Sequence, residues 1–221
     1  MRCVIFDLDG TLADTSGDLI AAANACFRGL GHGDMLDPGT DQSTALCGGR
    51  AMLKLGFQRL GQVEVEAQID AQYPVLLAAY GEEIDRFTVL YPGVVAAVER
   101  LRAEGYAVGI CTNKPEGLAE LLMTRLGVRG LFASLVGADT LPVRKPDPAP
   151  LREAVARAGG RMEHSILIGD TITDRDTARA AGVPCALVTF GPLGPDVADL
   201  APEALLSHYD DLGQVVAGLI G

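Results

Sequence analysis

Short apolar runs alternate, in the second part of the chain, with segments whose apolar residues recur at helical spacing. A short apolar run bounded by turn residues is typical of a buried strand. Such runs occur at residues 3–6, 106–111, 135–137, 165–168 and 185–189. Helical spacing predicts helices at 92–103, 115–126, 148–158, 174–181 and 210–220. Strands that alternate with helices predict a doubly wound α/β fold, in which helices cover both faces of a parallel sheet.

The pattern changes between Leu12 and roughly Phe87, where we expect no strand. Helical spacing covers Ser16–Arg28, Arg50–Leu60 and Val63–Tyr80, and Pro74 is expected to break or bend the third helix. An insert of roughly 70 residues is large enough for a small core of its own. We therefore predict a Rossmann-like α/β core made of residues 1–14 and 88–221, and an all-helical domain of residues 15–87.

Composition and charge narrow the possible functions. Of the 221 residues, 48% are hydrophobic, which is enough for a sizeable core. The formal net charge of −11 disfavours binding to nucleic acid or to an anionic membrane. No apolar run approaches the roughly 18–20 residues that span a bilayer, and the N-terminus does not resemble a signal peptide. We expect a soluble, cytoplasmic monomer or homodimer that binds neither nucleic acid nor membrane.

The five cysteines are scattered and form no CxxC pair. An odd number of unpaired cysteines argues against a disulfide framework, and their spacing does not fit a zinc site. We expect all five to be small, reduced core residues.

Polar residues follow the carboxyl ends of the expected strands. In open α/β sheets, ligands bind beyond these ends. The candidate residues are Asp7, Asp9, Thr112, Asn113, Lys145, Asp170 and Asp174. Because parallel strands end at one edge of the sheet, we expect these side chains to form one site, and the chemistry that they suit is phosphoryl transfer.

Three carboxylates in this set, those of Asp7, Asp170 and Asp174, would repel one another unless a cation lay between them. Oxygen ligands without His or Cys favour Mg²⁺. A carboxylate beside Mg²⁺ is a competent nucleophile toward phosphorus and divides hydrolysis into two displacements. The sequence therefore predicts a magnesium-dependent reaction that passes through an aspartyl phosphate.

The remaining candidates suit the other parts of such a reaction. Asp9 could protonate the leaving oxygen and then deprotonate the attacking water. Thr112 could hold the phosphoryl oxygens, and the Lys145 ammonium could neutralise their charge. Asn113 is placed with Thr112 as a phosphate-binding residue. Taken singly, Thr112-Asn113 could be a turn or a helix cap, Lys145 a surface charge, and Asp174 a cap of the following helix.

These residues resemble the motifs of the haloacid dehalogenase (HAD) superfamily, in the same order along the whole chain. FDLDGTL at Phe6–Leu12 resembles the first motif, and Thr112-Asn113 the second. Lys145-Pro146 resembles the third, and GDTITD at Gly169–Asp174 the fourth. The helical insert is similar to the cap domain of that superfamily. CTNKP, KPDPAP and DTARAAG are most similar to its phosphoglycolate-phosphatase-like subgroup.

The resemblance implies specific roles. Asp7 would be the nucleophile and a metal ligand. Asp9 would be the acid/base and would lend the metal its backbone carbonyl. Asp170 would be a metal ligand, and Asp174 would act on the metal through one of its ligands or through water. The acid at Asp9 argues against the dehalogenases and phosphonate hydrolases of the superfamily.

The cap is expected to reach the non-phosphate end of the substrate. The segment Leu46–Arg50 resembles the glycine-containing loop by which such caps contact substrate. Gly49 would allow close approach of the backbone, and Arg50 could pair with a substrate carboxylate. A flexible loop with an exposed arginine is the alternative. For Lys114, a plain surface or rim position is expected.

We therefore predict a phosphatase that hydrolyses a small phosphomonoester, phosphoglycolate-like or a sugar phosphate, with Mg²⁺ as cofactor. A sugar phosphomutase of the same superfamily is the nearer alternative, because it would use the same core. A signalling phospho-acceptor is more distant, because Asp9 and the inserted domain do not fit a protein that needs a long-lived phosphate.

Overall fold

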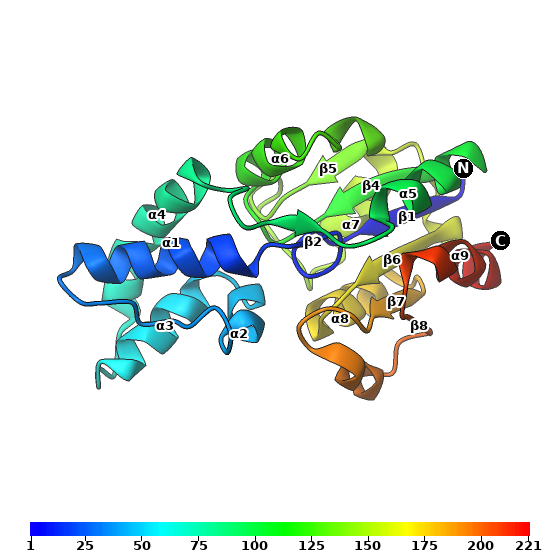
Figure 1. Cartoon of the computed structure of the whole chain (residues 1–221). Helices are drawn as coiled ribbons and strands as arrows, with labels where there is room; N and C mark the ends of the chain where they lie inside the picture. The colour runs from blue at the N-terminus through cyan, green and yellow to red at the C-terminus, as the bar shows by residue number, and fades with distance from the viewer. The chain divides into compact units, whose positions relative to one another are not determined.

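The computed structural model describes all of residues 1–221 and divides the chain into two compact units (Figure 1). The α/β unit consists of Met1–Ala13 and Leu90–Gly221, and the helical unit consists of Asp14–Val89. The chain therefore enters the helical unit soon after its first strand and returns to the α/β unit just before residue 90.

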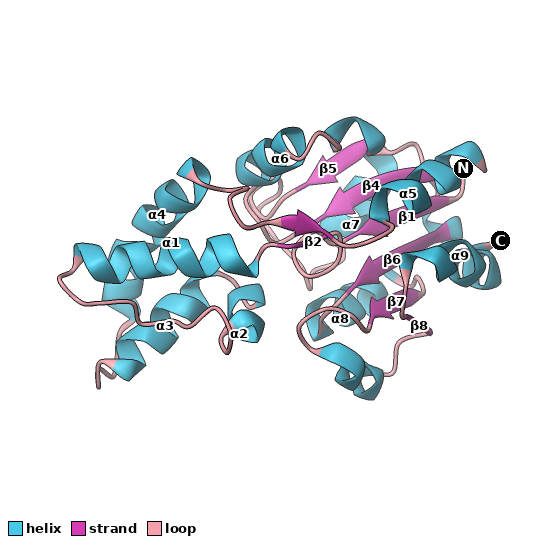
Figure 2. Cartoon of the chain, viewed as in Figure 1, coloured by secondary structure: helices cyan, strands magenta, loops and turns pink.

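The α/β unit is built on a six-stranded sheet in the order β5-β4-β1-β6-β7-β8, and every neighbouring pair is parallel (Figure 2). The strands are β1 (Cys3–Phe6), β4 (Ala107–Cys111), β5 (Ser134–Val136), β6 (Ser165–Gly169), β7 (Cys185–Val188) and β8 (Ala204–Leu206). Register aligns Phe6 with both Ile110 and Ile168. The residues that follow β1, β4 and β6 therefore emerge side by side at one edge, as the parallel α/β prediction requires.

Helices cover the sheet on both faces, which confirms the predicted doubly wound α/β fold. On one face α5 (Val94–Ala103) packs against β4, and α9 (Leu212–Ile220) packs against β6. On the other face α7 (Ala149–Arg157) packs against β4 and β5, and α8 (Ile172–Ala181) against β6 and β7. α6 (Glu116–Arg125) contacts β5. Short 3₁₀ turns occur at η1 (Arg129–Leu131), η2 (Met162–His164), η3 (Gly194–Leu200) and η4 (Tyr209–Asp211).

One strand was not predicted. β8, which has the sequence Ala-Leu-Leu, forms an edge of the sheet, and Leu205 is 42% exposed. Its apolar run of three residues is too short to show a period, and the strand is only partly buried, so the sequence does not distinguish this edge strand from a loop.

Apolar side chains of the central strands and of α7 and α8 form the core of this unit. Ile5, Leu151 and Leu167 are fully buried in it. Burial of each such side chain contributes roughly 1.5–3 kcal/mol relative to exposure. Cys3 and Cys111 are also buried, and burial raises the pKa of each thiol to about 12, so that both stay protonated and unreactive. The expectation of five core cysteines is wrong for Cys47, which is exposed because it follows a short surface helix.

The helical unit contains four helices: α1 (Ser16–Gly29), α2 (Gln42–Leu46), α3 (Gly49–Arg59) and α4 (Glu66–Glu82). Pro74 lies inside α4, and the helix continues beyond it. α2 was not predicted, because five residues are too few to show a periodic pattern. None of the helices combines the length and the apolar character that a membrane-spanning helix requires.

Two short strands lie where the chain passes between the units. β2 (Ala13–Asp14) pairs with β3 (Val89–Leu90) in a separate two-stranded sheet. The expectation of no strand between residue 12 and residue 87 is therefore wrong at Ala13–Asp14. Two residues cannot show alternation, and the pairing depends on Val89–Leu90, which lie far along the chain, so no local signal marks it.

A buried carboxylate joins the start and the end of the helical unit. Asp18, in the first turn of α1, is 2% exposed and accepts hydrogen bonds from the backbone N–H groups of Phe87 and Thr88. The Thr88 hydroxyl donates to the same carboxylate, at 2.7 Å. Charge-assisted hydrogen bonds are about twice as strong as neutral ones, so Asp18 fixes residues 87 and 88 against α1.

Candidate active site

The loop after β1 carries the first two candidate residues. The backbone N–H of Asp7 donates to the carbonyl of Ile168, which continues the β1–β6 pairing for one residue beyond the strand. Gly10 has φ of 78°, a backbone conformation that favours glycine, and its N–H donates to the carbonyl of Ala13. This tight turn keeps Asp7 and Asp9 at the carboxyl end of the sheet, where β4 and β6 also end.

Three carboxylates lie close together at the carboxyl end of the sheet. Oxygen atoms of Asp7, Asp170 and Asp174 all lie within 4.8 Å of one another. Burial, together with the charges of the other carboxylates, raises the pKa of Asp7 to about 7, although Lys145 opposes that rise. The pKa of Asp170 lies well above its ordinary value for the same reasons, burial first. Without a further cation, the three carboxylates therefore resist being ionised together.

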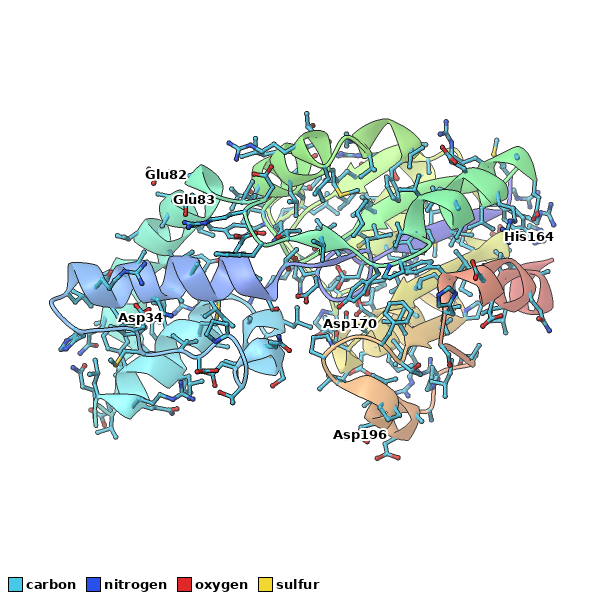
Figure 3. All side chains as sticks on the ribbon, in the orientation of Figure 1. Asp34, Glu82, Glu83, His164, Asp170 and Asp196 are labelled. Carbon is cyan, nitrogen blue, oxygen red and sulfur yellow. The ribbon has the colours of Figure 1, made fainter.

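Asp170 leaves one oxygen without a partner. Its Oδ1 accepts a hydrogen bond from the Thr11 hydroxyl at 3.1 Å, whereas its Oδ2 is buried and has no hydrogen-bond partner. Figure 3 labels Asp170 beyond the end of β6 and His164 at the opposite end of the same sheet. A buried carboxylate oxygen without a donor is costly. Together with the oxygen-only donor set, this fits a hard divalent cation.

Lys145 joins the carboxylates from the loop between β5 and α7. Its side chain is 1% exposed, and its Nζ lies 2.6 Å from Asp174 Oδ1 and 3.1 Å from Asp7 Oδ1. Burial opposes the charge of this ammonium, but the carboxylates of Asp174 and Asp7 outweigh burial and raise the pKa of Lys145 above its ordinary value. Lys145 is therefore a permanent cation inside the acidic cluster and not a surface charge.

Asp174 is held at both of its oxygens. Its Oδ1 pairs with Lys145, and its Oδ2 accepts from the Thr171 hydroxyl at 2.9 Å and from the Thr171 N–H at 3.2 Å. Thr171 and Asp174 form a capping box at the start of α8, in which Thr171 is the N-cap and Asp174 the third helical residue. The cap itself is thus Thr171. A Cβ on Gly169 would lie 2.4 Å from Asp174 Cγ, so only glycine fits there.

The end of β4 carries Thr112 and Asn113. Thr112 is 2% exposed, and its Oγ1 accepts from the Lys114 N–H at 3.1 Å, which leaves the hydroxyl hydrogen available to donate. The Asn113 Nδ2 donates to the carbonyl of Lys145 at 3.0 Å. Asn113 therefore joins the β4 end to the loop that carries Lys145.

Lys114 is buried and does not lie on the surface or at the rim of the site. It is 6% exposed, and its Nζ lies 2.7 Å from Asp9 Oδ1. The expectation of a surface or rim position is wrong, because β1 and β4 are neighbours and bring the two side chains together. The scarcity of lysine, with three in the whole chain, was the available signal that each position matters.

The remaining candidates, Gly49 and Arg50, lie in the helical unit at the start of α3. A Cβ on Gly49 would lie 3.0 Å from Leu76 Cδ2 and 3.1 Å from Tyr73 Cε2, so packing inside the unit also explains the glycine. Arg50 pairs with Glu66 at 3.1 Å and Asp70 at 2.7 Å. Its guanidinium is thus held by exposed carboxylates of α4 and is not a loosely placed side chain.

Comparison with known proteins identifies the family. The model of the haloacid dehalogenase-like hydrolases matches residues 4–188. The chain belongs to this family. A phosphoglycolate phosphatase of Mesorhizobium japonicum is 36% identical over 211 residues, which cover 95% of this chain and 92% of that protein. One of Cereibacter sphaeroides is 34% identical over 226 residues, and the match covers all of both chains. With such relatives, the chain is a phosphoric monoester hydrolase.

Solved structures show the same fold. A predicted phosphoglycolate phosphatase from Haemophilus somnus superposes with a TM-score of 0.85 over 97% of both chains, at 23% identity. A hydrolase from Pseudomonas syringae superposes with a TM-score of 0.78 over the whole of both chains, at 20% identity. The α/β sheet and the inserted helices are thus a shared architecture of these hydrolases.

Proposed function

We propose that this phosphatase hydrolyses a small phosphomonoester with Mg²⁺ through an aspartyl phosphate on Asp7. The observation that carries the proposal is the unpartnered, buried Oδ2 of Asp170 in the same cluster as Asp7 and Lys145. Asp7 and Asp170 would hold the cation with their carboxylates, Asp9 with its backbone carbonyl, and Asp174 through water. When bound, the cation would neutralise charge on the phosphoryl oxygens.

In the first displacement a carboxylate oxygen of Asp7 forms a bond to phosphorus while the ester P–O bond breaks. Asp9 gives a proton to the leaving oxygen, so that an alcohol and not an alkoxide departs. The Lys145 ammonium, 3.1 Å from Asp7 Oδ1, would neutralise the transferred phosphoryl group, and the Thr112 hydroxyl would donate to it.

In the second displacement water attacks phosphorus and loses a proton to Asp9. The bond between phosphorus and the Asp7 oxygen breaks, which releases phosphate and restores both carboxyl groups to their starting states. Because Asp9 takes a proton from the attacking water in place of the one that it gave to the leaving oxygen, one residue serves both halves of the reaction.

For the substrate we propose a phosphomonoester that also bears a carboxylate, such as phosphoglycolate. Both relatives described above are phosphoglycolate phosphatases. Arg50 offers a guanidinium that pairs with carboxylates, as its contacts with Glu66 and Asp70 show. A substrate carboxylate would exchange with one of these partners. Gly49 would allow the backbone at the start of α3 to approach the substrate closely.

A panel of phosphomonoesters, each assayed with Mg²⁺ and with EDTA, tests this function. We expect phosphate release that requires Mg²⁺ and is fastest with a carboxylate-bearing ester. The panel includes a hexose 1-phosphate, because a mutase would return an isomerised sugar phosphate where a hydrolase releases phosphate. Isomerisation without release, or release that persists in EDTA, would refute the proposal.

A further inference from the structure

Tyr209 comes from the C-terminal part of the chain and reaches the loop that carries the nucleophile. It lies in η4, is 1% exposed, and its hydroxyl donates to the backbone carbonyl of Thr11 at 2.8 Å. Its ring packs against Phe190 with centroids 5.4 Å apart, and Phe190 packs against Tyr91 at 4.9 Å. A Cβ on Gly93 would lie 3.1 Å from Tyr209 Cβ. The ring is therefore confined on several sides, and its hydroxyl has a defined position.

Thr11 connects Tyr209 to the proposed metal ligand. Thr11 is fully buried, and its hydroxyl donates to Asp170 Oδ1, which leaves Oδ2 as the unpartnered oxygen. The segment after β7 also packs closely against this loop. A Cβ on Gly191 would lie 3.0 Å from the Gly10 carbonyl oxygen and 3.4 Å from Asp170 Cβ. Two hydrogen bonds thus connect Tyr209 to Asp170 through Thr11, one at the Thr11 carbonyl and one at its hydroxyl.

We propose that Tyr209 is a positioning residue for Asp170: through Thr11, it keeps the free oxygen of that carboxylate aimed at the cation. The inference rests on the proposed function, because it concerns the metal site assigned there. Tyr209 takes no part in the two displacements described above. Burial, the neighbouring Tyr91 and the charge of Asp170 raise the pKa of Tyr209 well above its ordinary value, so the phenol keeps its proton at neutral pH.

Removal of a residue that orients a metal ligand typically weakens metal binding by about 10–100-fold. Thr11→Val removes the direct donor to Asp170 and should have an effect in that range. Thr11→Ser keeps the hydroxyl and should restore most of the affinity. Tyr209→Phe acts one hydrogen bond further away, and we expect it to weaken Mg²⁺ binding by about 3–10-fold. Because Tyr209 has no contact with substrate in this account, its loss should leave KM nearly unchanged at saturating Mg²⁺.

The experiment is calorimetric titration of Mg²⁺ into the metal-free full-length protein. The matched control is Tyr106→Phe, which makes the same chemical change at another buried tyrosine of the α/β unit, just before β4. We expect Tyr106→Phe to bind Mg²⁺ with the affinity of wild type, Tyr209→Phe to bind it more weakly, and Thr11→Val to bind it most weakly. A Tyr209→Phe protein whose Mg²⁺ affinity equals that of Tyr106→Phe would overturn the inference.

One further variant separates this inference from the proposed function. Asp170→Asn should abolish Mg²⁺ binding; if it binds like wild type, the metal site itself is misassigned. If Asp170→Asn fails to bind and Tyr209→Phe binds normally, only the role of Tyr209 is wrong. Circular dichroism in EDTA checks that each variant is folded. Should Tyr209→Phe not fold, Phe190→Leu, which loosens the ring and keeps the hydroxyl, should show weaker binding, and wild-type affinity there would refute the inference.

Discussion

The Lys114 ammonium lies 2.7 Å from Oδ1 of Asp9, the proposed acid/base, and its side chain is only 4% exposed. Taking two charged groups out of water is expensive, so such a pair gives weak evidence for a purely stabilising role. Asp9 lies on the loop after β1, and Lys114 follows the neighbouring strand β4. This contact therefore fixes the position of the carboxyl group that both proposed proton transfers would use.

Replacing Lys114 tests this relationship. Acid–base catalysis contributes about 10²–10⁴-fold, and Asp9→Asn should lose that much in kcat/KM with an alkyl phosphate. Lys114→Met should lose about 10-fold or more, because Asp9 is no longer held in place. Both losses should be smaller with p-nitrophenyl phosphate, whose leaving group departs without a proton. The control is Lys54→Met, an exposed lysine of α3. Equal losses of kcat/KM with the two substrates would contradict a role through Asp9.

The acidic cluster should make the metal-free protein less stable as pH rises. Burial raises the pKa of Asp7 to about 7 and the pKa of Asp170 well above its ordinary value. Above about pH 4 the folded protein then holds protons that the unfolded chain has lost, so the free energy of unfolding falls as pH rises toward 7. In EDTA, we expect a lower unfolding temperature at about pH 7.5 than at about pH 5.

Mg²⁺ should reverse this trend, because it binds the ionised carboxylates and stabilises the folded state more strongly at the higher pH. Asp7→Asn is the control: it removes one of the titrating groups and should flatten the dependence measured in EDTA. If wild type and Asp7→Asn lose stability equally between the two pH values, Asp7 does not contribute.

Two glycines of the helical unit, one in tight packing and one in open space, test how closely its core is packed. A Cβ on Gly56 would lie 2.1 Å from Phe27 Cζ, whereas a Cβ on Gly29 would meet nothing within 4 Å. Phe27 is fully buried against Phe57, with ring centroids 5.1 Å apart, and has little room to move. Gly56→Ala should therefore lower the free energy of unfolding by about 1–3 kcal/mol. Gly29→Ala should be neutral or stabilise by up to about 1 kcal/mol. Denaturant unfolding measures both, and equal effects would show that the contact with Phe27 is not tight.

Arg50 tests the part of the helical unit in substrate recognition. Its partners Glu66 and Asp70 are exposed, so Arg50→Ala should change stability by less than about 1 kcal/mol. If Arg50 pairs with the substrate, kcat/KM for phosphoglycolate should fall by about 10-fold or more, while that for p-nitrophenyl phosphate stays nearly constant. Arg86→Ala, another exposed arginine of the same unit, is the control. An unchanged kcat/KM with every substrate would remove Arg50 from the account.

The fold was predictable where the sequence carries a regular pattern. The continuous apolar run of β1 predicts a buried strand, and the helical spacing of α8 with Gly182 after it predicts a helix and its end. The alternation of such strands and helices predicts the parallel α/β architecture. β2 was missed because two residues cannot show a period, and β8 because its short run lies at a partly exposed edge of the sheet. Their strand character depends on partners distant in the sequence, Val89–Leu90 for β2 and β7 for β8.

The candidate site was predictable as a set of residues but not as a set of contacts. Strand-end position pointed to Asp7 and Asp170, because the topology alone brings strand ends to one edge. It did not show that Asn113 donates to the Lys145 carbonyl, or that Lys114 is buried on Asp9. Those contacts depend on loop conformations that strand and helix periodicity do not encode.

The central claim is that Asp7 carries the phosphoryl group during turnover. Rapid acid quench of the enzyme with a radiolabelled phosphomonoester and Mg²⁺, followed by peptide mapping, tests it directly. We expect acid-stable, hydroxylamine-labile label on the peptide that contains Asp7, and none with EDTA or in Asp7→Asn. Full turnover by Asp7→Asn, or label on another residue, would contradict the account.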